Sequence, residues 1–184
     1  MLIAGVDEVG RGAIAGPMTA ACVVLETGDR ISVDDSKNMT AHQREHHFDY
    51  VKEKAYDWSI VHVNPREIDN NGWQESNKKI LEKAVKELET TPDRIIVDGN
   101  IKLDLDIECR NVKKADSKYL VVGAASILAK VSRDRLMCIH REAHKYKWGS
   151  NKGYFTPEHK ELLAKHGAST FHRKSCSPVR EVLK

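Results

Sequence analysis

The sequence predicts an α/β fold with a central mixed β-sheet flanked by α-helices. Short β-branched segments come first in the chain, and segments with helical spacing then alternate with further strands. No internal repeat, low-complexity tract or proline- and glycine-rich linker interrupts the 184 residues. Since that length suits one domain with a substantial core, we expect a single domain over residues 1–184.

Strands are predicted where apolar, β-branched residues lie between turn signals. The glycine-rich turn GRGAIAG separates the first two strands, so a hairpin or meander is the expected opening of the sheet. The run RIIV is short and ends at Asp98-Gly99, the pattern of a buried strand followed by a turn. The expected strands span residues 2–7, 19–25, 58–63, 94–97 and 105–112.

Helices are predicted from capping signals and from apolar spacing. Thr40 followed by Gln43 fits a capping box, and Ile80, Leu81 and Ala84 recur at helical spacing. The expected helices span residues 41–54 and 76–89, run from 122 to about 146, and begin again near Pro157.

Acidic residues end two of the predicted strands. Asp7 and Glu8 close an apolar strand, where strand propensity gives no reason for two adjacent carboxylates, and Asp98 ends the RIIV strand in the same manner. Ligand sites in α/β sheets gather beyond the carboxyl ends of strands. If the two strands are neighbours, the three carboxylates converge.

A fourth carboxylate comes from the long predicted helix. At 100° per residue, Asp134 projects within about 20° of Ile127, on an apolar stripe that also includes Cys138. We therefore expect Asp134 to point inward. Because burial of an unpaired carboxylate costs several kcal/mol, it must be protonated, paired or bound to a cation. A buried ion pair with Arg133 or Arg135 is the structural alternative.

The four carboxylates have no cysteine or histidine cluster beside them, which favours Mg²⁺ or Mn²⁺ over zinc. Two such ions, about 4 Å apart, would stabilise the attacking and leaving oxygens of a phosphodiester and activate a water. The sequence therefore predicts metal-dependent phosphodiester hydrolysis.

Charge is divided unevenly along the chain, although the net charge is only +3. The part up to Cys109 has 13 basic and 21 acidic residues, and the part after it has 17 and 6. A surface for a polyanion beside a pocket for cations is the functional interpretation, and two ordinary solvated faces are the alternative. Candidate phosphate contacts are Ser36 and Lys37 in DDSK, Lys113, Lys114 and Lys118 in VKKADSK, and Arg173 and Lys174 in HRKS.

Three other patterns bear on the kind of site. HREAH places His140 and His144 four residues apart but is not HExxH, so solvated positions are favoured over a metal site. In GRGAIAG the third glycine, Gly16, lies one residue too far for a dinucleotide motif, and the glycines would instead let backbone amides approach a sugar or phosphate. Tyr154, in a basic loop, could stack on a sugar or base.

The sequence also predicts a compartment. No apolar stretch approaches the roughly 20 residues needed to cross a bilayer, and MLIAGVDEVG lacks the basic region of a secretory signal. The four cysteines lie far apart, and we interpret them as reduced, mostly buried thiols. We therefore expect a cytoplasmic protein without membrane contact.

Together the motifs resemble the type 2 ribonucleases H (ribonuclease HII). The resemblance rests on GVDEVGRGAIAGP, DDSK, IIVDGN, KADSKYLVVGAASILAKVSRDRLM and GYFTPEHKELLAKHG followed by HRKSCSPV, in matching order and spacing over nearly the whole chain. It implies a ribonuclease H-like fold. It also implies that Asp7, Glu8, Asp98 and Asp134, the four carboxylates identified above, are the catalytic metal ligands.

The resemblance further implies an endoribonuclease that hydrolyses the RNA strand of RNA–DNA hybrids. It would also cleave 5′ to ribonucleotides embedded in duplex DNA, leaving 3′-hydroxyl and 5′-phosphate ends, as excision of misincorporated ribonucleotides requires. By the same resemblance Gly10, Arg11 and Gly12 would sense the 2′-hydroxyl at an RNA–DNA junction, and Tyr154 would stack on the following deoxyribose. The helical part from about residue 147 to 184 would complete the substrate-binding face of a monomer.

Three features depart from the family pattern. Ala13 stands where the family usually has proline, Phe155 where it usually has glycine, and the segment 70–77 (NNGWQESN) is unlike the usual one. None removes a carboxylate. Two alternatives remain: a non-catalytic binder of RNA–DNA hybrids, and a ribonuclease H of type 1 or type 3.

Overall fold

The structure is a computed structural model that describes residues 1–28 and 39–184. A five-stranded sheet with the order β3-β2-β1-β4-β5 forms its centre. The β1–β2 and β2–β3 pairs are antiparallel, whereas the β1–β4 and β4–β5 pairs are parallel, so the sheet is mixed. The strands are β1 (Leu2–Val9), β2 (Met18–Glu26), β3 (Asp57–Val63), β4 (Arg94–Asp98) and β5 (Cys109–Val112).

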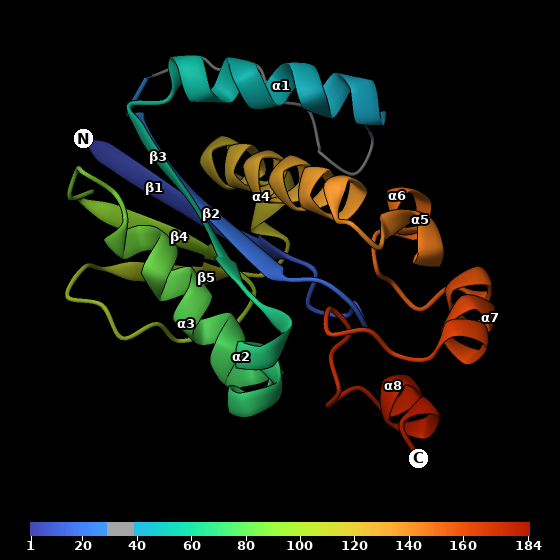
Figure 1. The fold of residues 1–184 in the computed structure, drawn as a ribbon. Helices are drawn as coiled ribbons and strands as arrows, with labels where there is room; N and C mark the ends of the chain where they lie inside the picture. Colours follow the sequence, from blue (N-terminus) through green and yellow to red (C-terminus); the bar gives the residue numbers. More distant parts are fainter. Residues whose placement is uncertain (29–38) are drawn as a thin grey trace.

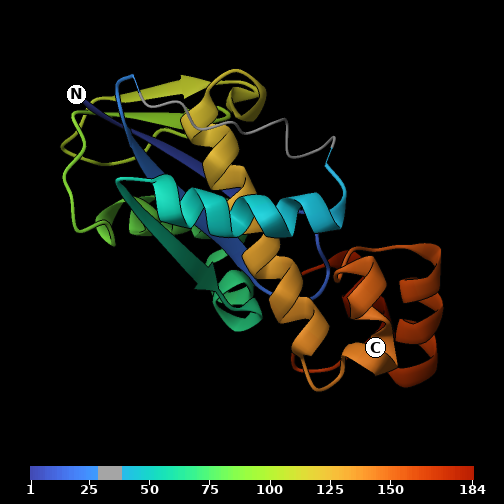
Figure 2. The same cartoon turned by 90° about the horizontal axis from the view of Figure 1, so that it is seen from above.

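Helices cover both faces of this sheet (Figure 1). One face carries α1 (Ala41–Lys54) and α4 (Leu120–Ile139), and α1 crosses over α4 (Figure 2). The opposite face carries α2 (Pro65–Asn71) and α3 (Trp73–Lys86). Beyond one end of the sheet lie α5 (Ala143–Tyr146), α6 (Trp148–Asn151), α7 (Pro157–His166) and α8 (Ser177–Val182). The predicted α/β architecture is confirmed.

Two apolar cores, one on each face, hold the layers together. Residues of β2 alternate between them: Ala21 and Val23 pack toward α4, while Ala20 and Cys22 pack toward α3. This burial on both faces explains why MTAACVVLE is almost uniformly apolar, as expected for a central strand. Strand β1 packs closely on α4 at Gly5, where a Cβ atom would lie 2.5 Å from the carbonyl carbon of α4 residue Val121.

Several boundaries differ from those predicted. Helix α4 ends at Ile139 and not near residue 146, because the chain turns at His140, whose ring stacks on Phe171 with a centroid distance of 4.0 Å. The last strand is limited to Cys109–Val112, and α3 begins and ends three residues before the predicted bounds.

Helix α2 was not predicted, although its signals are present in the sequence. Asn64 caps it, Glu67 completes a capping box, and Pro65 occupies its first position. The capping box predicted at Thr40 is present and begins α1. In the described ranges, no helix is both long and apolar enough to cross a membrane.

Candidate active site

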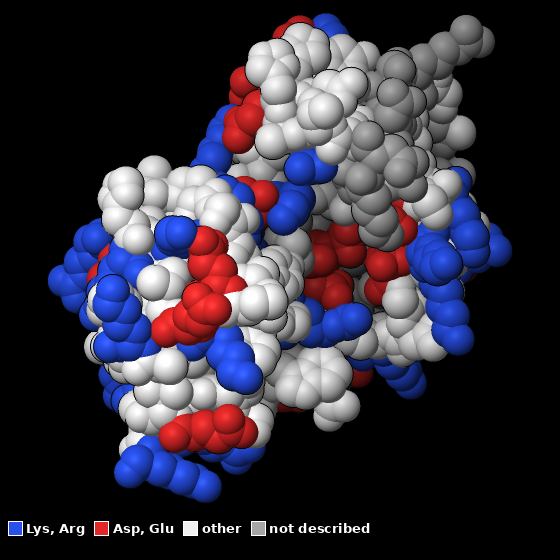
Figure 3. All heavy atoms as spheres, turned by 90° about the vertical axis from the view of Figure 1, so that its right-hand side faces the viewer, with Lys and Arg blue, Asp and Glu red and all other residues white. Residues whose placement is uncertain are grey.

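Three of the predicted carboxylates lie at one end of the sheet. Asp7 and Glu8 are near the end of β1, and Asp98 is the last residue of β4, its parallel neighbour. All three line a cavity of about 520 Å³. Parallel neighbours end at the same edge of a sheet, and this topology brings together side chains some 90 positions apart. Figure 3 shows acidic side chains in a hollow, with lysine and arginine beside them.

Asp7 and Glu8 reach this cavity from opposite faces of β1, because successive side chains of a strand alternate. Asp7 pairs across the sheet with Ala21, which belongs to the core beneath α4, and Glu8 pairs with Ala20, which belongs to the core beneath α3. The two carboxylates therefore straddle the end of the sheet.

The surroundings of Asp7 disfavour its charge. Burial, followed by the charges of Glu8 and Asp98, raises its pKa to about 8, although hydrogen bonds from the Ser126 hydroxyl and the Glu8 backbone N–H act in the opposite direction. The backbone N–H of Glu8 lies 2.8 Å from Asp7 Oδ1. Such a group takes up a proton near neutral pH unless a cation is nearby.

The pKa of Glu8 is also raised, mainly by burial. The guanidinium of Arg11, with Nη1 3.3 Å from Glu8 Oε1, lowers it in part. Asp98 Oδ1 accepts a hydrogen bond of 2.6 Å from the Ala115 backbone N–H. That bond ties the Asp98 carboxylate to the loop with sequence VKKADSK.

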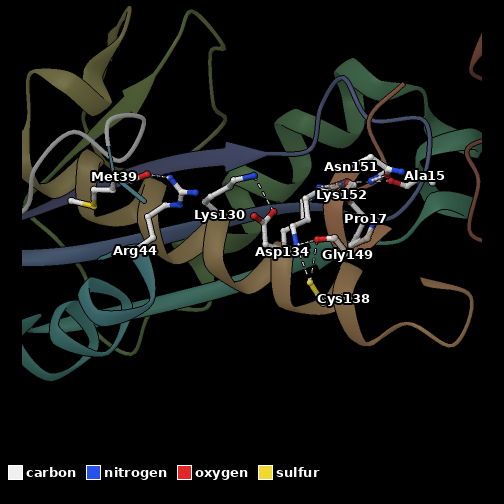
Figure 4. Close-up of polar contacts among 12 residues, drawn as sticks. Ala15, Pro17, Met39, Arg44, Lys130, Asp134, Cys138, Gly149, Asn151 and Lys152 are labelled. Carbon is white, nitrogen blue, oxygen red and sulfur yellow. Dashed lines mark hydrogen bonds and ion pairs between the residues drawn. The ribbon is translucent and has the colours of Figure 1, made fainter. Parts of the chain in front are cut away.

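Asp134 lies beside this cavity but is not part of its lining. It borders a neighbouring cavity of about 330 Å³, and its Oδ1 is 2.9 Å from Nζ of Lys130, which lines the first (Figure 4). Arg44 lines both cavities. The structure thus separates Asp134 from the other three carboxylates by the Lys130 ammonium.

The prediction that Asp134 lies on the buried stripe of α4 needs correction. Its side chain is 20% exposed, and Cys138 is exposed, because Arg133 and Met137 occupy the inward positions of these turns. The alternative of an ion pair with Arg133 or Arg135 is also wrong. Arg133 donates to the backbone carbonyls of Pro17, Lys152 and Ala15, and Arg135 pairs with Glu45.

The GRG loop packs against the buried Arg133 side chain. Gly10 has a φ of +88°, and a Cβ atom there would lie 2.3 Å from Arg133 Nε, so this position requires glycine. At Gly12, by contrast, a Cβ atom would meet nothing within 4 Å. Tyr154 is half-buried, and its ring lies 5.2 Å from the Arg133 guanidinium carbon. Arg133 therefore joins the glycine loop to the tyrosine.

Arg173, predicted to contact phosphate, is instead 1% exposed. It donates to the backbone carbonyls of Gly16 and Arg11, at 2.9 and 3.2 Å, and so holds the glycine loop from within. His140 and His144 do not share a helix face, because α4 ends at Ile139 and His144 belongs to the separate helix α5. Ser36 and Lys37 lie outside the described residues.

The cavity includes residues that the sequence argument missed. Asp116 is buried and lines it, and so do Arg44 and Lys130. Asp116 belongs to VKKADSK, where only the lysines drew attention, and Lys130 stands one helical turn before Asp134. In residues 1–28 and 39–184, no group of three or more His, Cys, Asp or Glu side chains is placed so that it could hold a metal ion as it stands.

Comparison with known proteins identifies relatives of this chain. The family model described as Ribonuclease HII matches residues 4–178. A ribonuclease HII of Idiomarina loihiensis is 40% identical over 99% of this chain and 98% of its own, and a ribonuclease HII 2 of Methylibium petroleiphilum is 42% identical over 99% and 85%. The crystal structure of ribonuclease H2 from Pyrococcus horikoshii OT3 is 31% identical, with a TM-score of 0.87 over 99% of this chain and 97% of that one.

Proposed function

The chain belongs to the ribonuclease HII family and is an enzyme of the type 2 ribonuclease H class, and on that premise we propose that it hydrolyses RNA paired with or embedded in DNA. Cleavage 5′ to an embedded ribonucleotide, leaving 3′-hydroxyl and 5′-phosphate ends, is the specific reaction. The observation that carries the proposal is the convergence of Asp7, Glu8 and Asp98, from neighbouring parallel strands, on one cavity.

Divalent cations fit this cavity by its donor chemistry. Burial and mutual repulsion disfavour the charges of Asp7 and Glu8, and a cation between such carboxylates would relieve both effects. Mg²⁺ or Mn²⁺ would supply an activated water and stabilise the charge on the phosphate oxygens. A solved ribonuclease HIII, related to this chain in fold at 18% identity, is described in complex with Mn²⁺.

We assign Asp7, Glu8 and Asp98 as ligands that hold the cations, with Asp134 as the fourth. Asp134 Oδ1 is 2.9 Å from the Lys130 ammonium, and we propose that this ion pair opens when Asp134 joins the other three. Lys130 would then be available to a substrate phosphate, which is the natural partner for an ammonium released at the rim of the cavity.

Recognition of the ribose is assigned to the GRG loop. Gly12 leaves its backbone open to an approaching sugar, and the Arg11 side chain is well exposed, 57%, while it contacts Glu8. Tyr154 is held on the other side of Arg133, where its ring would pack on the next deoxyribose. These contacts place the test for a 2′-hydroxyl beside the carboxylates, and so couple recognition to cleavage.

A duplex of DNA with one ribonucleotide tests the proposal directly. Wild-type protein should cut it at the ribonucleotide with Mg²⁺ or Mn²⁺ and not with chelator. Asp98→Asn should lose cutting but still bind and fold, because an asparagine oxygen can accept the hydrogen bond from the Ala115 N–H. Asp106→Asn, which changes an exposed carboxylate on the following loop, is the matched control and should cut normally.

Three outcomes would contradict the proposal. Binding without cutting by the wild type would favour a non-catalytic hybrid binder. Cutting within long RNA–DNA hybrids but never at a single ribonucleotide would favour the specificity of another ribonuclease H type. Equal cutting by Asp98→Asn would show that the catalytic carboxylates lie elsewhere.

A further inference from the structure

A third cavity borders the active site at the start of α3. It has a volume of about 480 Å³, and Arg11 lines both this cavity and the one that contains the carboxylates. The wall beyond Asp98 is formed by Asn100 and Lys102, on the loop that leaves β4. The cavity therefore adjoins the active site at two places. One is Arg11, which follows β1, and the other is the loop with Asn100 and Lys102, which follows β4.

The most unusual residue of this cavity is Trp73. Its indole is 50% exposed, although tryptophan side chains are normally buried for most of their area. Gly72, with φ +79°, ends α2 and precedes α3, so Trp73 is held on the corner between the two helices. The Arg11 guanidinium carbon lies 6.0 Å from the centroid of the ring, a cation–π distance. The same Arg11 contacts Glu8 of the active site.

The charges around the indole favour an anionic ligand. Arg11, Lys78 and Lys102 line the cavity with a single acidic side chain, Glu75. Glu75 is paired with Lys79, 3.3 Å away, and Lys78 with Asp104. Lys102 is exposed and is the cation best placed to meet a phosphate.

We propose that this cavity, defined by Trp73, Lys102 and Arg11, is a sugar–phosphate subsite for the duplex substrate. The inference rests on the proposed function, since the occupant is the nucleic acid whose scissile phosphate lies at the carboxylates. In a duplex the base faces are covered by stacking, so an indole approaching from outside meets the sugar ring, as proposed above for the Tyr154 ring. Lys102 binds the phosphate attached to that sugar. The subsite lengthens the contacted strand beyond the nucleotides held by the GRG loop.

Substrate length provides the decisive test. Cleavage by wild type, Trp73→Ala and Trp73→Phe is compared on duplexes with one ribonucleotide, trimmed one base pair at a time from either end. On long duplexes Trp73→Ala should lower kcat/KM roughly tenfold, as for loss of one aromatic contact to a nucleotide, and Trp73→Phe should retain most activity. On duplexes trimmed past the subsite, wild type and Trp73→Ala should cut equally. Tyr56→Ala, which removes an exposed ring elsewhere, is the matched control.

A second measurement does not require cutting. Trp73 should become protected from acrylamide quenching when duplex binds, and the protection should be absent in Trp73→Phe, because Trp148 is already fully buried and Trp58 lies beneath the Lys52 ammonium. The subsite is refuted, and the proposed function is left intact, if three results occur together. The wild type cuts, the defect of Trp73→Ala does not depend on duplex length, and Trp73 is not protected when duplex binds. Protection of Trp73 without any cutting would support the subsite and refute the hydrolysis.

Discussion

Replacement of Asp7 by asparagine should stabilise the protein in the absence of divalent cations. Burial raises the pKa of Asp7 from its ordinary 3.8 to about 8, so at pH 7 the folded protein retains a proton that the unfolded chain has released. For a carboxyl group with a raised pKa, stability is greatest at low pH and is lost as pH rises from about 4 to about 8. At 1.36 kcal/mol per pH unit, the cost at pH 7 is about 4 kcal/mol.

Asparagine carries no charge and still offers an oxygen to the Glu8 N–H, which lies 2.8 Å from Asp7 Oδ1. We expect Asp7→Asn to recover about 2–4 kcal/mol, which for a domain of this size raises Tm by roughly 5–15 °C. The assay is thermal unfolding at pH 4, 7 and 9, with chelator and with Mg²⁺ or Mn²⁺. The gain should be small at pH 4 and large at pH 9.

Divalent cations should reverse this order. Wild-type protein gains stability when a cation binds between its carboxylates, and Asp7→Asn should gain little. Asp106→Asn serves as the control for loss of a carboxylate at an exposed position and should match the wild type throughout. Two results would refute this explanation, in which burial destabilises the charged form of Asp7 and a bound cation offsets that cost. One is an Asp7→Asn variant that is less stable than the wild type in chelator at pH 9. The other is a difference in stability between the two proteins that does not change with pH.

Three further predictions concern the scaffold of the site. Gly5→Ala should cost about 3 kcal/mol in urea unfolding, because its Cβ would meet α4 backbone at 2.5 Å. Gly12→Ala, by contrast, should leave stability unchanged and lower cleavage at a single ribonucleotide. Equal stability of the two variants would contradict the packing argument. Arg133→Met should cost about 3 kcal/mol or more, because three backbone carbonyls lose a charged donor, and an unchanged free energy of unfolding would show that water replaces it. Burial, with the charges of His159 and Lys145, lowers the pKa of His172 to about 4. The free energy of unfolding should therefore fall by at most about 3 kcal/mol as pH drops from 6.5 to 4. A similar dependence of stability on pH in His172→Gln would assign the loss to other groups.

The fold class and most elements could be predicted from local patterns. The apolar run of β2, the capping box at Thr40 and the turn after RIIV are each encoded within a few residues. The misjudged end of α4 has a tertiary cause. Helical spacing continues past Ile139, but the stacking of His140 on Phe171, some thirty residues later, turns the chain there. Such a contact leaves no local signal.

The chemical character of the site was encoded in the sequence, because two adjacent carboxylates at the end of an apolar strand have no role in strand packing. Its assembly was decided by tertiary structure. The parallel pairing of β1 with β4 brings Asp98 to Asp7 and Glu8, whereas the inward turns of α4 are taken by Arg133 and Met137, leaving Asp134 at the rim with Lys130. Likewise, the sequence predicted Arg173 as a phosphate contact and identified Trp73 only as part of the segment 70–77 that departs from the family pattern. The fold buries the arginine behind the glycine loop and exposes the indole beside it, since burial depends on contacts among distant segments that one-dimensional spacing does not specify.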